Sequence, residues 1–110
     1  MYNIKLLNKI SDVGLSKYDK GKYNYGDEIE NPDAVMVRSA SMHDMAMPDS
    51  LLAIARAGAG TNNIPVSDCA NDGIVVFNTP GANANAVKEL VILGLLLSSR
   101  KVTKAIDWCK

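Results

Sequence analysis

Residues 51–77 read LLAIARAGAGTNNIPVSDCANDGIVVF, and this pattern indicates how the chain folds. An apolar run ends at two closely spaced glycines, a polar segment begins at Pro65, and a second apolar run follows Gly73. Continuous apolar runs that a short helix separates are typical of parallel strands with both faces covered. We therefore expect a buried strand, a glycine-containing turn, a helix with Pro65 in its first position, and a second buried strand.

The turn RAGAG is similar to the start of a dinucleotide-binding loop. Gly58 and Gly60 fit two positions of the G-x-G-x-x-G pattern, but Asn63 stands at the third. An asparagine side chain there would obstruct the close helix–strand contact that the third glycine permits, so we reject this loop as the cofactor site. Glycines with a positive φ could instead turn backbone N–H groups toward a carboxylate or phosphate. An anion-binding turn and a structural turn without a ligand both remain open.

The preceding half of the chain supplies further candidate strands. Its apolar runs predict strands at residues 4–7 and 33–39. The polar segment 11–32 predicts a weak helix or loop, with a short strand near 23–25. The segment 41–50 predicts a helical turn.

Residues 83–102 predict a long helix that is buried nearly all round, because apolar residues fill most of its circumference. Asn83 or Asn85 would cap this helix, and Glu89 would lie in its first turn. Residues 101–110 would begin another helix.

These elements predict an α/β fold, a flavodoxin-like parallel sheet with helices on both faces. Ligands of such sheets bind beyond the carboxyl ends of the strands. Three of these ends carry polar sequences, RSAS at 38–41, RAGAGTNN at 56–63 and NTPGANAN at 78–85. A guanidinium, backbone N–H groups and an asparagine would share one edge, which suits a small anion with a carboxylate or phosphate.

Composition excludes several other classes. With 110 residues the chain is one small domain or part of a larger one, and 12 basic residues balance 12 acidic ones. This balance argues against nucleic-acid and anionic-membrane binding. Cys69 and Cys109 suggest neither a metal site nor a disulfide framework. The first ten residues show no signal segment, and the apolar stretch 90–97 is too short to span a membrane, so we expect a cytoplasmic protein.

The segments AVMVRSAS (34–41) and LLAIARAGAGTNNIPVSDCANDGIVVFNTPGANANAVKELVILGLLLSSR (51–100) resemble the N-terminal part of the D-isomer-specific 2-hydroxyacid dehydrogenases. The resemblance runs from about residue 34 to 102 and is strongest to the branch that acts on 3-phosphoglycerate. It implies an NAD-dependent oxidoreductase that oxidises 3-phosphoglycerate to 3-phosphohydroxypyruvate, the first step of serine biosynthesis. It also implies that residues 1–85 belong to the substrate domain of a two-domain enzyme and residues 86–110 to an interdomain helix and the start of the next helix, with the nucleotide domain outside this chain.

The resemblance assigns roles residue by residue. It implies a substrate phosphate at Arg38 and Ser39 with Arg56 nearby, a substrate carboxylate at the N–H groups of Ala59 and Gly60, a substrate contact at Asn83, and a contact with the nicotinamide of NAD at Val87. Two positions depart from the family pattern. Asn62 replaces a usual aspartate, which puts any role of that carboxylate in doubt, and Lys88 replaces a small residue for no physical reason that we find.

The catalytic arginine, glutamate and histidine that the resemblance implies lie beyond residue 110. His43 is the one histidine of the chain and matches no catalytic position, so we expect a surface or capping role. We therefore expect no catalytic residue in this chain, no bound metal, and no turnover by the 110 residues alone.

The resemblance places the long helix at a subunit interface, so we expect a homodimer through residues 86–99. Two alternatives stay open. One is a related dehydrogenase of glycerate, lactate or another 2-keto acid, which would not need Arg38. The other is a non-catalytic flavodoxin-like binding domain, which would need acidic strand ends where this chain has Arg38, Arg56 and Asn78.

Overall fold

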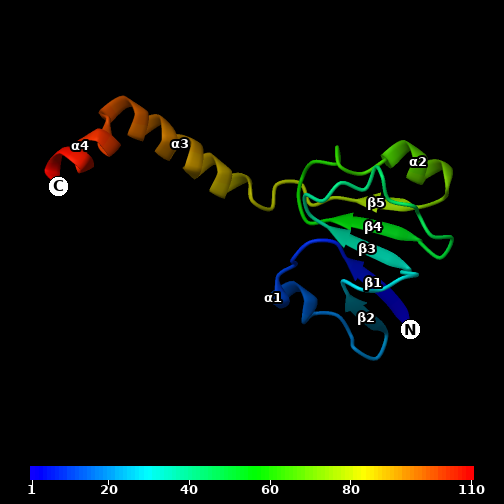
Figure 1. Ribbon diagram of the computed structural model, residues 1–110. Helices are drawn as coiled ribbons and strands as arrows, with labels where there is room; N and C mark the ends of the chain where they lie inside the picture. The colour runs from blue at the N-terminus through cyan, green and yellow to red at the C-terminus, as the bar shows by residue number, and fades with distance from the viewer. The chain divides into compact units, whose positions relative to one another are not determined.

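The computed structural model describes all 110 residues, which form two compact units, Met1–Pro80 and Gly81–Lys110 (Figure 1). The first unit contains five strands and two short helices, in the order β1 (Tyr2–Leu6), α1 (Asp12–Leu15), β2 (Tyr23–Gly26), β3 (Ala34–Val37), β4 (Ala53–Arg56), α2 (Val66–Asn71) and β5 (Val75–Phe77).

The five strands form one parallel sheet in the order β2-β1-β3-β4-β5. This is the flavodoxin-like strand order, as expected from the sequence. The chain moves from β1 outward to β2 and then returns to the other side of β1 to begin β3. The strand order therefore reverses between β1 and β3, which is the point where sheets of this kind bind ligands.

The main hydrophobic core covers one face of the sheet. Val35, Val37 and Ile54 point into it and are fully buried. They pack with side chains from α2 and the loops around it, namely Met42, Leu51, Ile64, Cys69 and Ile74.

The segment that contains α1 lies over part of the opposite face. Met36 lies between the two core valines of β3 and therefore points to the other face. There its Sδ accepts a hydrogen bond of 3.2 Å from the hydroxyl of Tyr18, which follows α1. The predicted parallel α/β sheet is confirmed. This opposite face is covered only in part, because Val75 and Phe77 of β5 lie on it and are 52% and 58% exposed.

Gly73 follows the end of α2 as predicted, but Pro65 does not occupy the predicted first helical position. Pro65 precedes the first helical residue, Val66, instead of occupying the first position itself. Gly73 has a φ of +76°, a conformation that other residues adopt only with strain, and it turns the chain into β5. The segment between β3 and β4 is a loop with a single turn, closed by a bond from the N–H of Met45 to the carbonyl oxygen of Met42.

The second unit consists of α3 (Ala84–Arg100) and α4 (Val102–Cys109), joined at Lys101 with a φ of 53°. Asn83 is the N-cap of α3 but makes no side-chain capping bond, and Glu89 lies beyond the first turn, which corrects that prediction. The Oε1 atom of Glu89 instead accepts a bond of 3.5 Å from the amide of Asn85, one helical turn earlier. None of the helices is long and apolar enough to cross a membrane.

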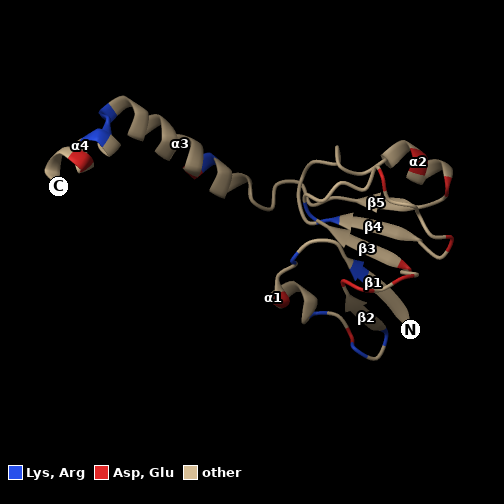
Figure 2. Cartoon of the chain, viewed as in Figure 1, with Lys and Arg blue, Asp and Glu red and all other residues tan.

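The prediction that the long helix is buried nearly all round is wrong for this chain. No residue of α3 is buried, and its large aliphatic side chains are between 36% (Leu97) and 67% (Leu90) exposed. Figure 2 shows that the charged residues of α3 lie toward its two ends, so its middle is an uncharged apolar surface. Within the C-terminal unit only α4 contacts α3, and eight residues cannot cover that surface.

Candidate functional site

Side-chain hydrogen bonds tie together the loops at the carboxyl ends of β4 and β5. The hydroxyl of Thr79 donates to the carbonyl oxygens of Arg56 at 3.2 Å and Gly58 at 3.3 Å. The amide of Asn78 donates to the carbonyl oxygen of Ala59 at 2.8 Å. The prediction that these polar strand ends meet at one edge is therefore confirmed for β4 and β5.

The turn after β3 is held from both sides. Oδ1 of Asn8, which follows β1, accepts hydrogen bonds from the N–H groups of Arg38 at 2.7 Å and Ala40 at 3.1 Å. Nδ2 of Asn63, which follows β4, donates to the carbonyl oxygens of the same two residues at 3.0 and 2.8 Å. The two asparagines thus satisfy four backbone groups of a turn that has no sheet partner of its own.

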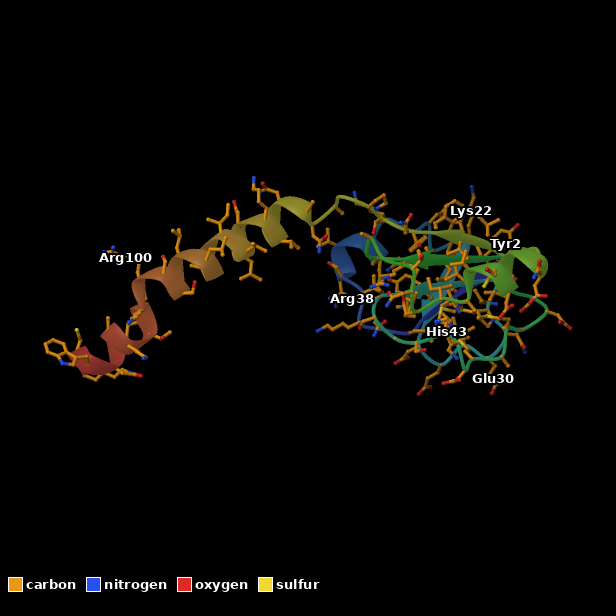
Figure 3. All side chains as sticks on the ribbon, turned by 90° about the horizontal axis from the view of Figure 1, so that it is seen from above. Tyr2, Lys22, Glu30, Arg38, His43 and Arg100 are labelled. Carbon is orange, nitrogen blue, oxygen red and sulfur yellow. The ribbon has the colours of Figure 1, made fainter.

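Arg38 and Ser39 lie on this turn, at the point where the strand order reverses. Both are exposed. Nη1 of Arg38 is 3.4 Å from the carbonyl oxygen of Lys9, in the loop that leads into α1, and Figure 3 shows Arg38 beside that helix. The Arg38 guanidinium binds no carboxylate.

The guanidinium of Arg56 is held by amides. Its Nη1 donates to Oδ1 of Asn62 at 3.3 Å and to Oδ1 of Asn63. Its Nε is buried and has no hydrogen-bond partner. The positive charge of Arg56 is therefore not neutralised by any side chain that it binds, and one buried donor is left unsatisfied.

The two glycines of the RAGAG turn, Gly58 and Gly60, lie next to the Arg56 side chain. Neither has a positive φ, so the proposed nest of left-handed glycines is wrong; the glycines with a positive φ are Gly73 and Gly81. A Cβ atom at Gly58 would lie 3.1 Å from Nε of Arg56, and one at Gly60 would lie 3.4 Å from Nη1. The first distance is tighter than an ordinary contact, so the absence of a side chain at Gly58 leaves room for the guanidinium, whereas the second distance is close to an ordinary van der Waals contact.

The N–H groups of Ala59 and Gly60 face no acceptor within the chain, since neither donates a hydrogen bond. They are the two groups to which the resemblance assigns a substrate carboxylate. Their assignment as a site stays a prediction.

Asn83 and Val87 belong to the C-terminal unit, Gly81–Lys110. Asn83 precedes α3, and Val87 lies in the first turn and is 50% exposed. Their contacts with substrate and nicotinamide also stay predictions.

His43 acts within the loops of the first unit. Its ring Nε2 is 2.7 Å from the carbonyl oxygen of Asn62, and its backbone N–H donates a hydrogen bond of 3.4 Å to Oγ of Ser41. The ring links the turn after β3 to the turn after β4, and no carboxylate orients it as a general base would require.

The residues described here do not form a dinucleotide-binding loop. Asn63, at the third position of the glycine pattern, is 8% exposed, and both donors and the acceptor of its amide are used within the protein. α2 begins three residues later, at Val66, so the turn does not open directly into a helix as that loop does.

A separate cavity of about 520 Å³ opens beyond the ends of β1 and β2. Asn8 and Lys9 line it, whereas none of the predicted substrate residues does. This cavity therefore adjoins the turn after β3 without being the predicted site.

Sequence reasoning missed the residues that hold the site together, Asn8, Asn63 and Thr79. A signal was present for Asn8 and Thr79, which are polar residues with short side chains two positions after a strand, whereas Asn63 stands seven positions after β4. Side chains of this kind commonly bind nearby backbone groups.

Comparisons with known proteins identify the family of this chain. The D-isomer specific 2-hydroxyacid dehydrogenase catalytic domain matches residues 2–106. The chain therefore belongs to the D-isomer specific 2-hydroxyacid dehydrogenases, a family of oxidoreductases.

Relatives of this chain include D-3-phosphoglycerate dehydrogenases and a hydroxypyruvate reductase. That of Mycobacterium leprae is 34% identical over 80 residues, which cover 70% of this chain and 15% of the relative. That of Methanocaldococcus jannaschii is 30% identical over 109 residues, 93% of this chain and 20% of the relative. The hydroxypyruvate reductase of Thermotoga maritima is 39% identical over 80 residues, 70% of this chain and 26% of the relative. The chain thus spans about a quarter or less of these curated relatives.

A solved structure has the same fold. It is the NAD+-bound 3-phosphoglycerate dehydrogenase of Entamoeba histolytica, with a TM-score of 0.73 and 25% sequence identity. The match covers 87% of this chain and 38% of that one. The fold of this chain thus corresponds to about two fifths of that dehydrogenase chain.

Proposed function

We propose that this chain is the substrate-binding segment of an NAD-dependent enzyme that oxidises 3-phosphoglycerate to 3-phosphohydroxypyruvate, the first step of serine biosynthesis. The observation that carries the proposal is a pair of arginines at neighbouring strand ends, Arg38 after β3 and Arg56 at the end of β4, neither bound to a carboxylate. Guanidinium groups bind phosphate and carboxylate oxygens through paired donors. The named relatives and the NAD+-bound structure support this substrate and this cofactor.

In this proposal the residues bind and orient the substrate. Arg38 and Ser39 hold the phosphate, and Arg56 lies near them. The free N–H groups of Ala59 and Gly60 hold the carboxylate. Asn83 would add a substrate contact and Val87 a contact near the nicotinamide, while NAD, when bound, supplies the hydride acceptor.

A second candidate is a related dehydrogenase that acts on an unphosphorylated 2-hydroxy acid. The 39% identity with a hydroxypyruvate reductase favours it. The two candidates differ in what Arg38 does, because an unphosphorylated substrate presents no phosphate to this side chain.

Titration of the ¹⁵N-labelled chain with 3-phosphoglycerate and with D-glycerate, followed by NMR, tests the proposal. We expect 3-phosphoglycerate to bind more tightly, with shifts at the amides of Ala59 and Gly60. Arg38→Ala should remove the preference, and Lys22→Ala, which removes one exposed positive charge elsewhere, should leave it unchanged. Equal affinity of the unaltered chain for both ligands would favour the second candidate.

We also propose that the 110 residues do not turn over on their own. His43 is engaged by a backbone carbonyl oxygen and lacks a carboxylate partner. An assay of 3-phosphohydroxypyruvate reduction with NADH tests this directly, and any NADH consumption above a blank would contradict it.

We propose, finally, a cytoplasmic homodimer that binds neither nucleic acid nor membranes. The exposed apolar surface of α3 supports the dimer, because burying such side chains in a second copy is favourable. The balanced charge supports the absence of nucleic-acid and membrane binding.

A further inference from the structure

We propose that Asn62 and Asn63 are positioning residues that hold the Arg56 guanidinium through neutral amides, so that its charge stays available to an anion at the strand ends. This inference rests on the proposed function and concerns the same site. It adds two residues that no resemblance assigns to substrate binding.

The hydrogen-bond partners of Arg56 are uncharged. Nη1 binds two oxygens, Oδ1 of Asn62 at 3.3 Å and Oδ1 of Asn63, and both belong to uncharged side chains. An amide oxygen orients a guanidinium without cancelling its charge, whereas a carboxylate does both. Arg56 is therefore fixed in place and still carries a full positive charge.

One donor of Arg56 has no hydrogen-bond partner. Its Nε is buried without a partner, and a buried unsatisfied donor is unfavourable. Because this Nε is enclosed by the protein, an anion would accept from it only after the Arg56 side chain shifts, and that bond would remove the penalty. The neighbouring N–H groups of Ala59 and Gly60 are also free, so the donors that such an anion needs belong to one short segment.

Asn63 connects Arg56 to the turn after β3. The Oδ1 atom of this buried side chain binds Arg56, and its Nδ2 donates to the carbonyl oxygens of Arg38 and Ala40. Only an amide can accept on one side and donate twice on the other. Asn63 therefore sets the turn that carries Arg38 in a fixed relation to the guanidinium of Arg56.

Asn62 offers the sharper test because it is exposed and can be changed without disturbing the core. Asn62→Asp replaces the neutral oxygen by a carboxylate, which would pair with Arg56 and repel an anion. Asn62→Ala removes the hydrogen bond but adds no charge, and Asn63 still holds the guanidinium. Asn71→Asp is the matched control, since it adds the same negative charge at an exposed position on α2.

The probe is sulfate, titrated into the ¹⁵N-labelled 110-residue chain at neutral pH and low salt. We expect sulfate to shift the amides of Ala59 and Gly60 and the Nε–H signal of Arg56. Asn62→Asp should weaken sulfate binding about fivefold, the effect of one charge a few ångströms away in a water-exposed site. Asn62→Ala and Asn71→Asp should each stay within about twofold of the unaltered chain, and added salt should shrink the effect of Asn62→Asp.

Three results would overturn the inference: no sulfate binding by the unaltered chain, equal weakening by Asn62→Asp and Asn71→Asp, or equal weakening by Asn62→Ala and Asn62→Asp. The last of these would mean that the hydrogen bond matters and the neutrality does not. The proposed function fails separately, by equal affinity for 3-phosphoglycerate and D-glycerate, whatever the Asn62 variants do with sulfate.

Discussion

Gly58 and Arg56 are two residues apart, and the absence of a side chain at the first makes room for the guanidinium of the second. A Cβ atom at Gly58 would lie 3.1 Å from Nε of Arg56, closer than most Cβ atoms come to another heavy atom. The RAGAG turn therefore contains glycine because of a side chain that folds back onto it. A left-handed backbone plays no part, since Gly58 has no positive φ.

Gly58→Ala should displace the Arg56 guanidinium and weaken sulfate binding. The backbone of Gly58 suits alanine, so we expect the free energy of unfolding to change by less than about 1 kcal/mol. Sulfate titration by NMR and urea unfolding measure the two effects. Gly14→Ala is the control, because a Cβ atom there meets nothing within 4 Å, and unchanged sulfate binding in Gly58→Ala would refute the steric argument.

Asn63→Ala should destabilise the first unit. The change leaves the carbonyl oxygens of Arg38 and Ala40 without their donor at a buried position, and such losses cost about 1–3 kcal/mol. Urea unfolding followed by circular dichroism measures this. Asn24→Ala removes an exposed amide that binds Asn3 and should change stability by less than about 0.5 kcal/mol. Equal losses of stability in the two variants would show that the buried hydrogen bonds of Asn63 stabilise the fold no more than the exposed one of Asn24.

Cys69 and Cys109 should differ in reactivity and in their effect on stability. Burial, with the nearby carboxylates of Asp72 and Asp68, raises the pKa of the Cys69 thiol above its ordinary value, whereas Cys109 is exposed. With a disulfide reagent at mildly alkaline pH, Cys109 should react at once and Cys69 only when the chain unfolds. Rapid modification of both thiols in the folded chain would contradict this.

The raised pKa of Cys69 also predicts a pH dependence of stability. The folded chain keeps the thiol protonated where the unfolded chain ionises it, so this stabilisation is complete below the ordinary thiol pKa of about 8.5 and is lost as pH rises through the higher folded value. Urea midpoints measured across that range should fall, and Cys69→Ala should reduce the fall. A slope unchanged by that substitution would assign the pH dependence to other groups.

The apolar surface of α3 should make the chain self-associate. Leu95 is 65% exposed, and burying a leucine side chain is worth about 1.5–3 kcal/mol. Leu95→Lys should therefore weaken the dimer about tenfold or more, as measured by light scattering across a dilution series. Asn85→Lys adds the same charge at a polar position of α3 and should leave the dimer intact; a monomer of 11.8 kDa at all concentrations would contradict the proposed interface.

Most of the architecture could be predicted from local patterns. Continuous apolar runs such as residues 34–37 and 53–56 indicate strands covered on both sides, and their polar ends indicate the ligand edge. The burial of α3 was predicted wrongly because periodicity shows that a helix has apolar surface, and it does not show what covers that surface.

The amino-acid sequence alone specifies the parallel α/β sheet, its polar edge and the two arginines there, since these depend on runs of neighbouring residues. The partners of those arginines depend on the folded chain. Asn63 binds a turn 25 residues away and Asn8 binds it from 30 residues away, because the strand order brings the ends of β1, β3 and β4 together. Hydrogen bonds between segments so distant leave no periodic trace in the sequence. Asn62 and Asn63 are only six and seven residues from Arg56, but no local pattern shows that the turn folds their amides back onto its guanidinium.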